Sequence, residues 1–181
     1  RTIYDPKFSR VFPTEPSQGD GHRGIAWPRG RIVGGSSSIN GLIYIRGQHE
    51  DFDDWQSLGA EGWSWDAALP HFKRIERYAG GEDCWHGRDG ELTVSDLRNR
   101  NPACDAWIAA AQEYGLPHNP DFNGATTMGV GSYQLSIGRR LRASAAVAFL
   151  RPALSRPNLT LLTGVHVTRV LFQGTRPVGV E

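Results

Sequence analysis

Glycine and proline are the feature of this sequence that most restricts its fold. The 181 residues include 22 glycines and 11 prolines, about 18% of the chain against an average of roughly 12%. They are spread without a period, which excludes a collagen-like repeat and predicts many loops. The 6 Trp, 7 Phe and 5 Tyr supply enough apolar surface for a folded core, so a disordered chain is disfavoured.

Charge and cysteine content exclude several classes of protein. With 20 basic and 19 acidic residues the net charge is only +1, which gives no electrostatic reason to expect binding to nucleic acid or to an anionic bilayer. The apolar stretches, such as residues 145–150, are far shorter than the roughly 18 residues of a membrane helix, so no transmembrane segment is expected. Two cysteines, Cys84 and Cys104, form no disulfide framework and favour a reducing, cytoplasmic location.

A metal site is not expected either. None of the six histidines has a second histidine four residues away, the spacing that places two ligands on one helix face. Cys84, His86 and Cys104 are an alternative zinc set, but ordinary packing is favoured because no second close pair of thiols accompanies them. The acidic run of residues 50–54 fits the first turn of a helix better than a cation site.

Apolar spacing and helix caps predict a mixture of separated helices and short strands, an α+β fold with a small antiparallel sheet. Helices are expected at residues 50–58, 64–79, 102–114 and 144–154, with a short one starting at the serines 36–38. Residues 1–31 are expected to form an extended arm with a turn at Gly19–Gly21. Strands are expected at residues 91–95, 130–135, 158–163, 166–172 and 177–181, the last two joined as a hairpin.

The segment that carries the most chemistry is the glycine–serine loop, residues 31–41. Gly34 and Gly35 lack side chains, and they precede three serines, so backbone N–H groups there can face an anion or a flat ring. The loop matches neither G-x-x-x-x-G-K-[ST] nor G-x-G-x-x-G, so a phosphate site of those kinds is unsupported. By itself the pattern fits a ligand-binding loop and an ordinary tight turn equally well.

Several motifs resemble those of one family in order and rough spacing. Residues 27–41, WPRGRIVGGSSSING, resemble the first signature of the glucose-methanol-choline (GMC) flavoprotein oxidoreductases. The resemblance covers nearly the whole chain. It continues through YIRG (44–47), DFDDW (51–55), EGWSW (61–65), HGRDGEL (86–92), DFNG (121–124), RASAA (142–146) and RPNLT (156–160).

This resemblance implies an FAD cofactor. The residues that line the pyrophosphate and ring in the family are similar to Ile32 to Ser36 and Ser38. Those at the isoalloxazine edge are similar to residues 40–43, and the valine that meets the adenine is similar to Val167. Ile39 stands where some members have a histidine that binds FAD covalently, so FAD is expected to be noncovalent. The expected cofactor-binding residues are Arg31, Ile32, Val33, Gly34, Gly35, Ser36, Ser38, Asn40, Gly41, Leu42, Ile43 and Val167.

The resemblance also implies the reaction: oxidation of a choline-like or other primary alcohol to an aldehyde, by hydride transfer to the flavin. It leaves the electron acceptor open between oxygen and a quinone. The family's G-x-G-x-x-G turn and late catalytic histidine correspond to positions outside these 181 residues. No catalytic residue is therefore expected here, and the chain is expected to be an inactive piece of a longer polypeptide. The alternative is a nonenzymatic module that binds an anion or flavin.

Three parts are expected within the chain. Residues 1–48 would hold the arm and the glycine–serine loop of an FAD-binding domain. Residues 49–140 would form a mainly helical cap and part of a substrate-binding domain, and residues 141–181 would return to the FAD domain. Self-association through exposed apolar surfaces is a further expectation.

Overall fold

The computed structural model describes residues 2–16 and 24–181 and has the predicted α+β architecture. Three α-helices longer than one turn dominate it: α1 (His49–Ser57), α2 (Trp65–Ile75) and α3 (Pro102–Glu113). The shorter helices are η1 (Thr2–Tyr4), the 3-10 turn η2 (Gly35–Ser38), the π-helical η3 (Ala146–Leu150) and α4 (Arg151–Ala153). The strands are β1 (Ser9–Pro13), β2 (Ala26–Gly30), β3 (Glu76–Arg77), β4 (Leu92–Thr93), β5 (Ile137–Gly138), β6 (Leu141–Arg142), β7 (Val170–Gln173) and β8 (Arg176–Val180).

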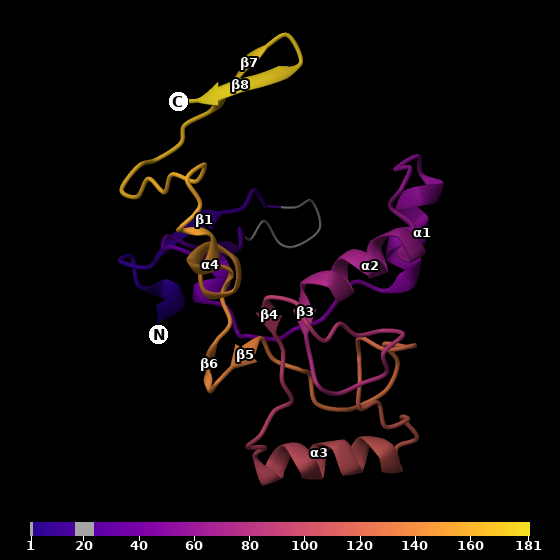
Figure 1. Cartoon of the computed structure of the whole chain (residues 1–181). Coiled ribbons are helices and arrows are strands. Elements are labelled where there is room, and N and C mark those ends of the chain that lie inside the picture. The colour runs from indigo at the N-terminus through magenta and orange to yellow at the C-terminus, as the bar shows by residue number, and fades with distance from the viewer. Residues whose placement is uncertain (1, 17–23) are drawn as a thin grey trace.

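The strands form four separate pairs within the described residues. Three are antiparallel: β1 with β2, β5 with β6 and β7 with β8. The pair β3–β4 is parallel and extends for only two residues on each strand. Figure 1 shows the β7–β8 hairpin apart from the rest of the ribbon at one end, and α3 along the opposite edge.

Local capping explains where the helices start. The Ser64 side chain accepts a hydrogen bond from Ala67 N–H at the start of α2, and the Asn101 side chain accepts one from Ala103 N–H at the start of α3. A capping box joins Gln48 and Asp51 at the start of α1. Such caps satisfy N–H groups that have no partner inside the helix. The predicted helices at 50–58, 64–79 and 102–114 are confirmed, although the second ends at Ile75.

An aromatic cluster joins α1 to α2. The Phe52 ring lies 5.5 Å from that of Trp65 and 5.7 Å from that of Phe72, and the His49 ring stacks on Trp65 at 4.0 Å. Both Phe52 and Trp65 are buried. Edge-to-face aromatic pairs add to the stabilisation that burial alone gives.

The prediction of a short helix starting at the serines is wrong, because the helical turn there ends at Ser38. The serines lie in η2, a single 3-10 turn, and the residues after it form no helix: Leu42 has a left-handed φ of 70°, and Ile43 forms an isolated bridge with Leu135. Their backbone bonds go to a distant segment instead: Ser136 N–H donates to Leu42 C=O, and Tyr44 N–H donates to Gln134 C=O. These long-range bonds replace the i to i−4 bonds that a helix would need.

Two predicted strands are also wrong. Residues 158–163 form no strand, since the described part of the chain offers them no pairing partner. Residues 130–135 form isolated bridges only, at Val130 and Leu135. The hairpin predicted at the end of the chain is confirmed, with its first strand beginning at Val170.

The remaining expectations are met in part. The strand predicted at 91–95 is β4, followed by a bridge at Ser95, and the helix predicted at 144–154 is split into η3 and α4. The arm predicted at 1–31 contains the β1–β2 pair. Its turn at Gly19–Gly21 lies outside the described residues. No described helix is long and apolar enough to cross a membrane.

Gly87 provides a test of this packing. A Cβ atom there would lie 1.8 Å from the backbone oxygen of Lys73, so Gly87→Ala is expected to lower the free energy of unfolding by about 1–3 kcal/mol. Urea unfolding followed by tryptophan fluorescence measures it. Gly179→Ala is the matched control, because the nearest atom to its Cβ, in Leu171, would be 3.9 Å away. Equal stability of the two variants would contradict the packing described here.

Candidate active site

The glycine–serine loop makes a tight bend that depends on its two adjacent glycines. Gly34 has a φ of 91° and Gly35 a φ of 57°, both in the left-handed region. A Cβ at Gly34 would lie 2.5 Å from Ser38 Oγ and 3.0 Å from Ala146 Cβ, whereas one at Gly35 would meet no atom within 4 Å. The backbone at Gly34 is therefore packed against η3, and the backbone at Gly35 faces open space.

The serine hydroxyls hold the bend together. Ser37 Oγ donates to Gly34 C=O at 2.5 Å, and Ser38 Oγ donates to Val33 C=O at 2.9 Å. Ser36 Oγ accepts from Gly30 N–H at 3.1 Å. Ser37 and Ser38 thus satisfy carbonyls of the loop itself, while the Ser36 hydroxyl keeps its hydrogen for another acceptor.

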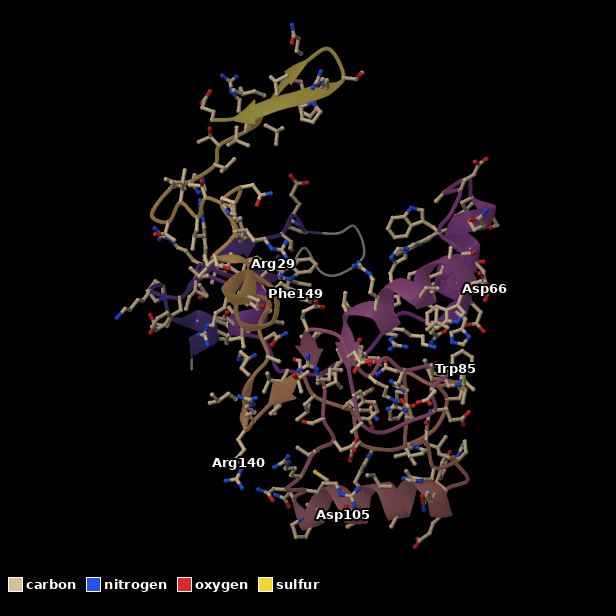
Figure 2. The ribbon with its side chains drawn as sticks, viewed as in Figure 1. Arg29, Asp66, Trp85, Asp105, Arg140 and Phe149 are labelled. Atoms are coloured by element: carbon tan, nitrogen blue, oxygen red, sulfur yellow. The ribbon has the colours of Figure 1, made fainter. Side chains whose placement is uncertain are left out.

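Arg142 fixes the far end of the loop. Its guanidinium donates to Asn40 Oδ1 at 2.5 Å and to Ser37 C=O at 3.2 Å. Arg139 and Arg140 form the tight turn between β5 and β6, both with positive φ, and Figure 2 shows Arg140 pointing away from the molecule. These three arginines therefore have two roles: Arg139 and Arg140 form an exposed turn, and Arg142 anchors the loop.

An open cleft of about 1290 Å³ lies along the first half of the loop. One wall is residues 29–34 and a second is residues 161–166. Tyr4 of η1, Pro6, β1 and Leu150 contribute the rest. The charged side chains lining it are basic: Arg10, Arg29 and Arg31. Figure 2 labels Arg29 and Phe149 on this side of the molecule. Pockets for small molecules and cofactors usually measure about 300–1,000 Å³, so the cleft is large enough for a dinucleotide.

The cleft unites some of the predicted site residues and not others. Arg31, Ile32, Val33 and Gly34 line it together with His166, the neighbour of Val167 in the chain. Val167 itself is exposed next to the cleft. The other predicted residues belong to η2 and the segment that leaves it: Gly35, Ser36, Ser38, Asn40, Gly41, Leu42 and Ile43.

A buried ion cluster follows the loop in the chain, and the sequence analysis missed it. Arg46 donates to Glu76 Oε2 at 2.9 Å, and the His86 ring lies between two carboxylates. Its Nδ1 is 3.1 Å from Glu76 Oε2 and its Nε2 is 2.7 Å from Asp121 Oδ2. Glu76 is 0% exposed and His86 is 2% exposed. Arg46, His86 and Asp121 belong to motifs that resemble those of the family, but nothing in those motifs indicated that the three side chains meet.

The ion cluster shifts the acid–base equilibria of its members. Burial alone would lower the pKa of His86, but the hydrogen bonds to Asp121 and Glu76 outweigh it and raise that pKa to about 9. Burial alone would raise the pKa of Glu76, yet the bonds from His86 and from Gly87 N–H outweigh it and lower that pKa. The pKa of Asp121 is lowered in the same way, by His86 and by Asn123 N–H. At neutral pH the cluster therefore holds two positive and two negative charges.

Comparison with known proteins identifies the family. The sequence profile described as GMC oxidoreductase matches residues 17–181. The chain belongs to the GMC oxidoreductase family. It is 43% identical over 176 residues to an alcohol dehydrogenase [acceptor] of Pseudomonas putida, covering 97% of this chain and 32% of the relative. It is also 43% identical to the mitochondrial choline dehydrogenase of Mus musculus, covering 99% of this chain and 30% of the relative.

Two solved structures share the fold. Pyridoxine 4-oxidase from Mesorbium loti superimposes with a TM-score of 0.87 at 34% identity, over 96% of this chain and 35% of that one. An FAD-dependent oxidoreductase from Chaetomium thermophilum gives a TM-score of 0.87 at 29% identity, over 98% of this chain and 33% of that one. The chain thus spans about a third of the length of the relatives it matches.

The two glycines of the bend predict different responses to alanine. Gly35→Ala carries only the backbone cost of left-handed φ, about 1–2 kcal/mol, because its Cβ would meet nothing. Gly34→Ala adds a clash with Ser38 Oγ and Ala146 and is expected to lose about 1–3 kcal/mol more. Thermal unfolding followed by circular dichroism ranks the two. A Gly35→Ala variant less stable than Gly34→Ala would mean that the bend is packed differently.

The ion cluster predicts a pH-dependent stability. The folded chain keeps the His86 proton up to about pH 9, whereas the unfolded chain releases it near 6.5, so stability is expected to fall between these values. Glu76 and Asp121 have lowered pKa values, so their contribution is complete above about 4.5 and is lost at more acidic pH. Urea midpoints at about pH 5.5, 7.5 and 9.5 measure the alkaline limb, and a flat profile would contradict the cluster.

Proposed function

We propose that this chain forms the flavin-facing part of an FAD-dependent oxidoreductase that oxidises choline or another primary alcohol to an aldehyde. The observation that carries this proposal is the bend at Gly34 and Gly35, which adjoins a basic cleft of about 1290 Å³. Membership of the GMC family, with relatives named alcohol dehydrogenase and choline dehydrogenase, supports the reaction class.

The described residues fit FAD. The Cβ position at Gly35 is open, so a flat ring system can approach the backbone there. Arg10, Arg29 and Arg31 along the cleft suit the negative diphosphate of a dinucleotide. Ile39 offers no nucleophile for a covalent link, so these residues would hold FAD noncovalently. Bound FAD supplies the acceptor for the hydride that leaves the alcohol carbon.

The roles of individual residues follow from their positions. In this proposal Arg31, Ile32, Val33 and Gly34 hold the dinucleotide along the cleft, and Val167 borders the same space. Gly35 and Ser36 offer a bare backbone and a free hydroxyl hydrogen, and Asn40 to Ile43 continue along the ring edge. The group that removes the alcohol proton would come from residues outside this chain, since a proton acceptor must lie within hydrogen-bond distance of the hydroxyl.

The division of the chain is part of the same proposal. Residues 1–48 and 141–181 would belong to an FAD-binding domain, and residues 49–140 to a cap and substrate-binding part. Exposed apolar side chains in the last segment, including Leu162, Val165 and Phe172, would drive self-association of the isolated chain. We also propose a cytoplasmic location.

The central test compares this chain with the protein obtained by extending its reading frame to the length of the relatives. The extended protein is expected to carry FAD and to reduce an artificial electron acceptor when choline or a primary alcohol is added. The 181-residue chain is expected to give no turnover. Turnover by the chain alone would overturn the placement of the proton acceptor, and FAD binding without alcohol oxidation by the extended protein would favour a nonenzymatic flavin-binding module.

Gly35→Ala tests the bend directly in the extended protein. A Cβ atom in the open space at Gly35 is expected to raise the Kd for FAD by at least about tenfold, which corresponds to 1.4 kcal/mol. Fluorescence titration of the apoprotein with FAD measures it. Gly59→Ala is the matched control, because Gly59 also has a positive φ and an open Cβ position but lies at the end of α1. Equal Kd values for the two variants would contradict the proposed contact.

A further inference from the structure

The His86 ring faces acceptors on both sides. An ionised carboxylate only accepts hydrogen bonds, and the two ring nitrogens face Glu76 and Asp121. A neutral imidazole carries a single N–H, so one of its nitrogens would turn a lone pair toward a carboxylate. The geometry therefore requires both nitrogens to be protonated. With the imidazolium present the ion cluster is neutral overall. Without it, the buried Glu76 and the half-buried Asp121 carboxylates are left with one guanidinium, which donates to Glu76.

Two routes connect His86 to the segment Tyr44–Arg46, which continues from the glycine–serine loop. The first passes through Glu76 to the Arg46 side chain. The second passes through Asp121, whose Oδ1 accepts from Asn123 N–H at 3.0 Å. The Asn123 side chain in turn accepts from Arg46 N–H at 2.8 Å and donates to Tyr44 C=O at 3.1 Å. Side chain and backbone of the segment are both held by groups that touch the imidazolium.

We propose that His86 is a positioning residue whose imidazolium locks residues 44–46, and through them residues 40–43, and that loss of its proton releases this segment. The lock itself is independent of the proposed function. Its effect on cofactor binding rests on that function, because residues 40–43 are the ones assigned to the flavin edge. His86 itself lies outside the cleft and is assigned no contact with a ligand.

Other charged and titratable groups near His86 leave this assignment in place. The Tyr78 ring lies 4.9 Å from the His86 ring. The Tyr78 hydroxyl donates a hydrogen bond to Asp96 Oδ1, and burial raises the pKa of Tyr78. Burial also raises the pKa of Tyr44. Both phenols therefore stay neutral while His86 titrates. The groups that face His86, directly or through one partner, are Glu76, Asp121, Arg46, Tyr78, Tyr44 and Asp96.

Nuclear magnetic resonance on the 181-residue chain tests the lock without a cofactor. The His86 ring is expected to titrate with a midpoint near 9. The exchange protection of Arg46 N–H, corrected for the intrinsic pH dependence of exchange, is expected to fall at least about tenfold between about pH 7 and pH 10, with the same midpoint. Tyr114 N–H at the end of α3 should keep its protection.

Variants separate positioning from simple packing. Asp121→Asn keeps the shape but removes one charge, so it is expected to lower the His86 midpoint and to shift the Arg46 exchange midpoint equally. His86→Gln is expected to abolish the pH step, while His71→Gln leaves it unchanged. If His86→Gln does not fold, the titrations of the original chain and of Asp121→Asn decide. A His86 midpoint near 6.5 would overturn the proposal. So would an Arg46 exchange protection that does not change over the pH range in which His86 titrates.

Cofactor binding gives a separate arm. In the extended protein the Kd for FAD is expected to rise over the pH range in which His86 loses its proton, and His86→Gln should remove that dependence. A protein that binds no FAD at any pH would contradict the proposed function. The His86 titration and the Arg46 exchange profile would then still test whether His86 holds residues 44–46. If the His86 and Arg46 midpoints agree but the Kd for FAD does not change with pH, the effect of the imidazolium does not reach residues 40–43.

Discussion

Burying the ion cluster of Arg46, Glu76, His86 and Asp121 is the constraint on which the arrangement of the site depends. An isolated charge in a protein interior is strongly unfavourable, and removing one partner of a buried pair typically costs about 3–5 kcal/mol. Each member of the cluster comes from a different segment, and Arg46 and Asp121 are 75 positions apart in the chain. Those segments can separate only by leaving charges unpaired, so the cluster fixes the helical part of the molecule relative to the loop.

The glycine–serine loop then spans two fixed supports. At its start, Arg31 N–H donates to Phe8 C=O at 2.7 Å, next to the β1–β2 pair. At its end, Arg142 holds Asn40, and residues 42–44 bond to residues 134–136. Because both ends are tied, the left-handed glycines between them can adopt only the observed bend. The loop is preorganised before any ligand arrives, which reduces the entropy lost on binding.

The sequence predicted what is decided locally. Ser64, Asn101 and the acidic turn after Gln48 cap their own helices, so short-range patterns placed α1, α2 and α3 correctly. Gly34 and Gly35 likewise identified the bend from the lack of side chains alone. What failed was decided at long range. Residues 42–44 bond to a segment 90 to 94 positions away, and the ion cluster pairs charges that no local periodicity connects.

The two walls of the cleft differ in how firmly they are held, and this difference bears on how a ligand would bind. Residues 29–34 are tied to the β1–β2 pair and to η3. Residues 160–167 are exposed throughout and lead to a two-stranded hairpin, a unit that is only marginally stable by itself. A dinucleotide that touches both walls would restrict the freedom of the second one, and that loss of freedom opposes binding. Contacts that hold β7–β8 in place would therefore raise affinity for the cofactor without touching it.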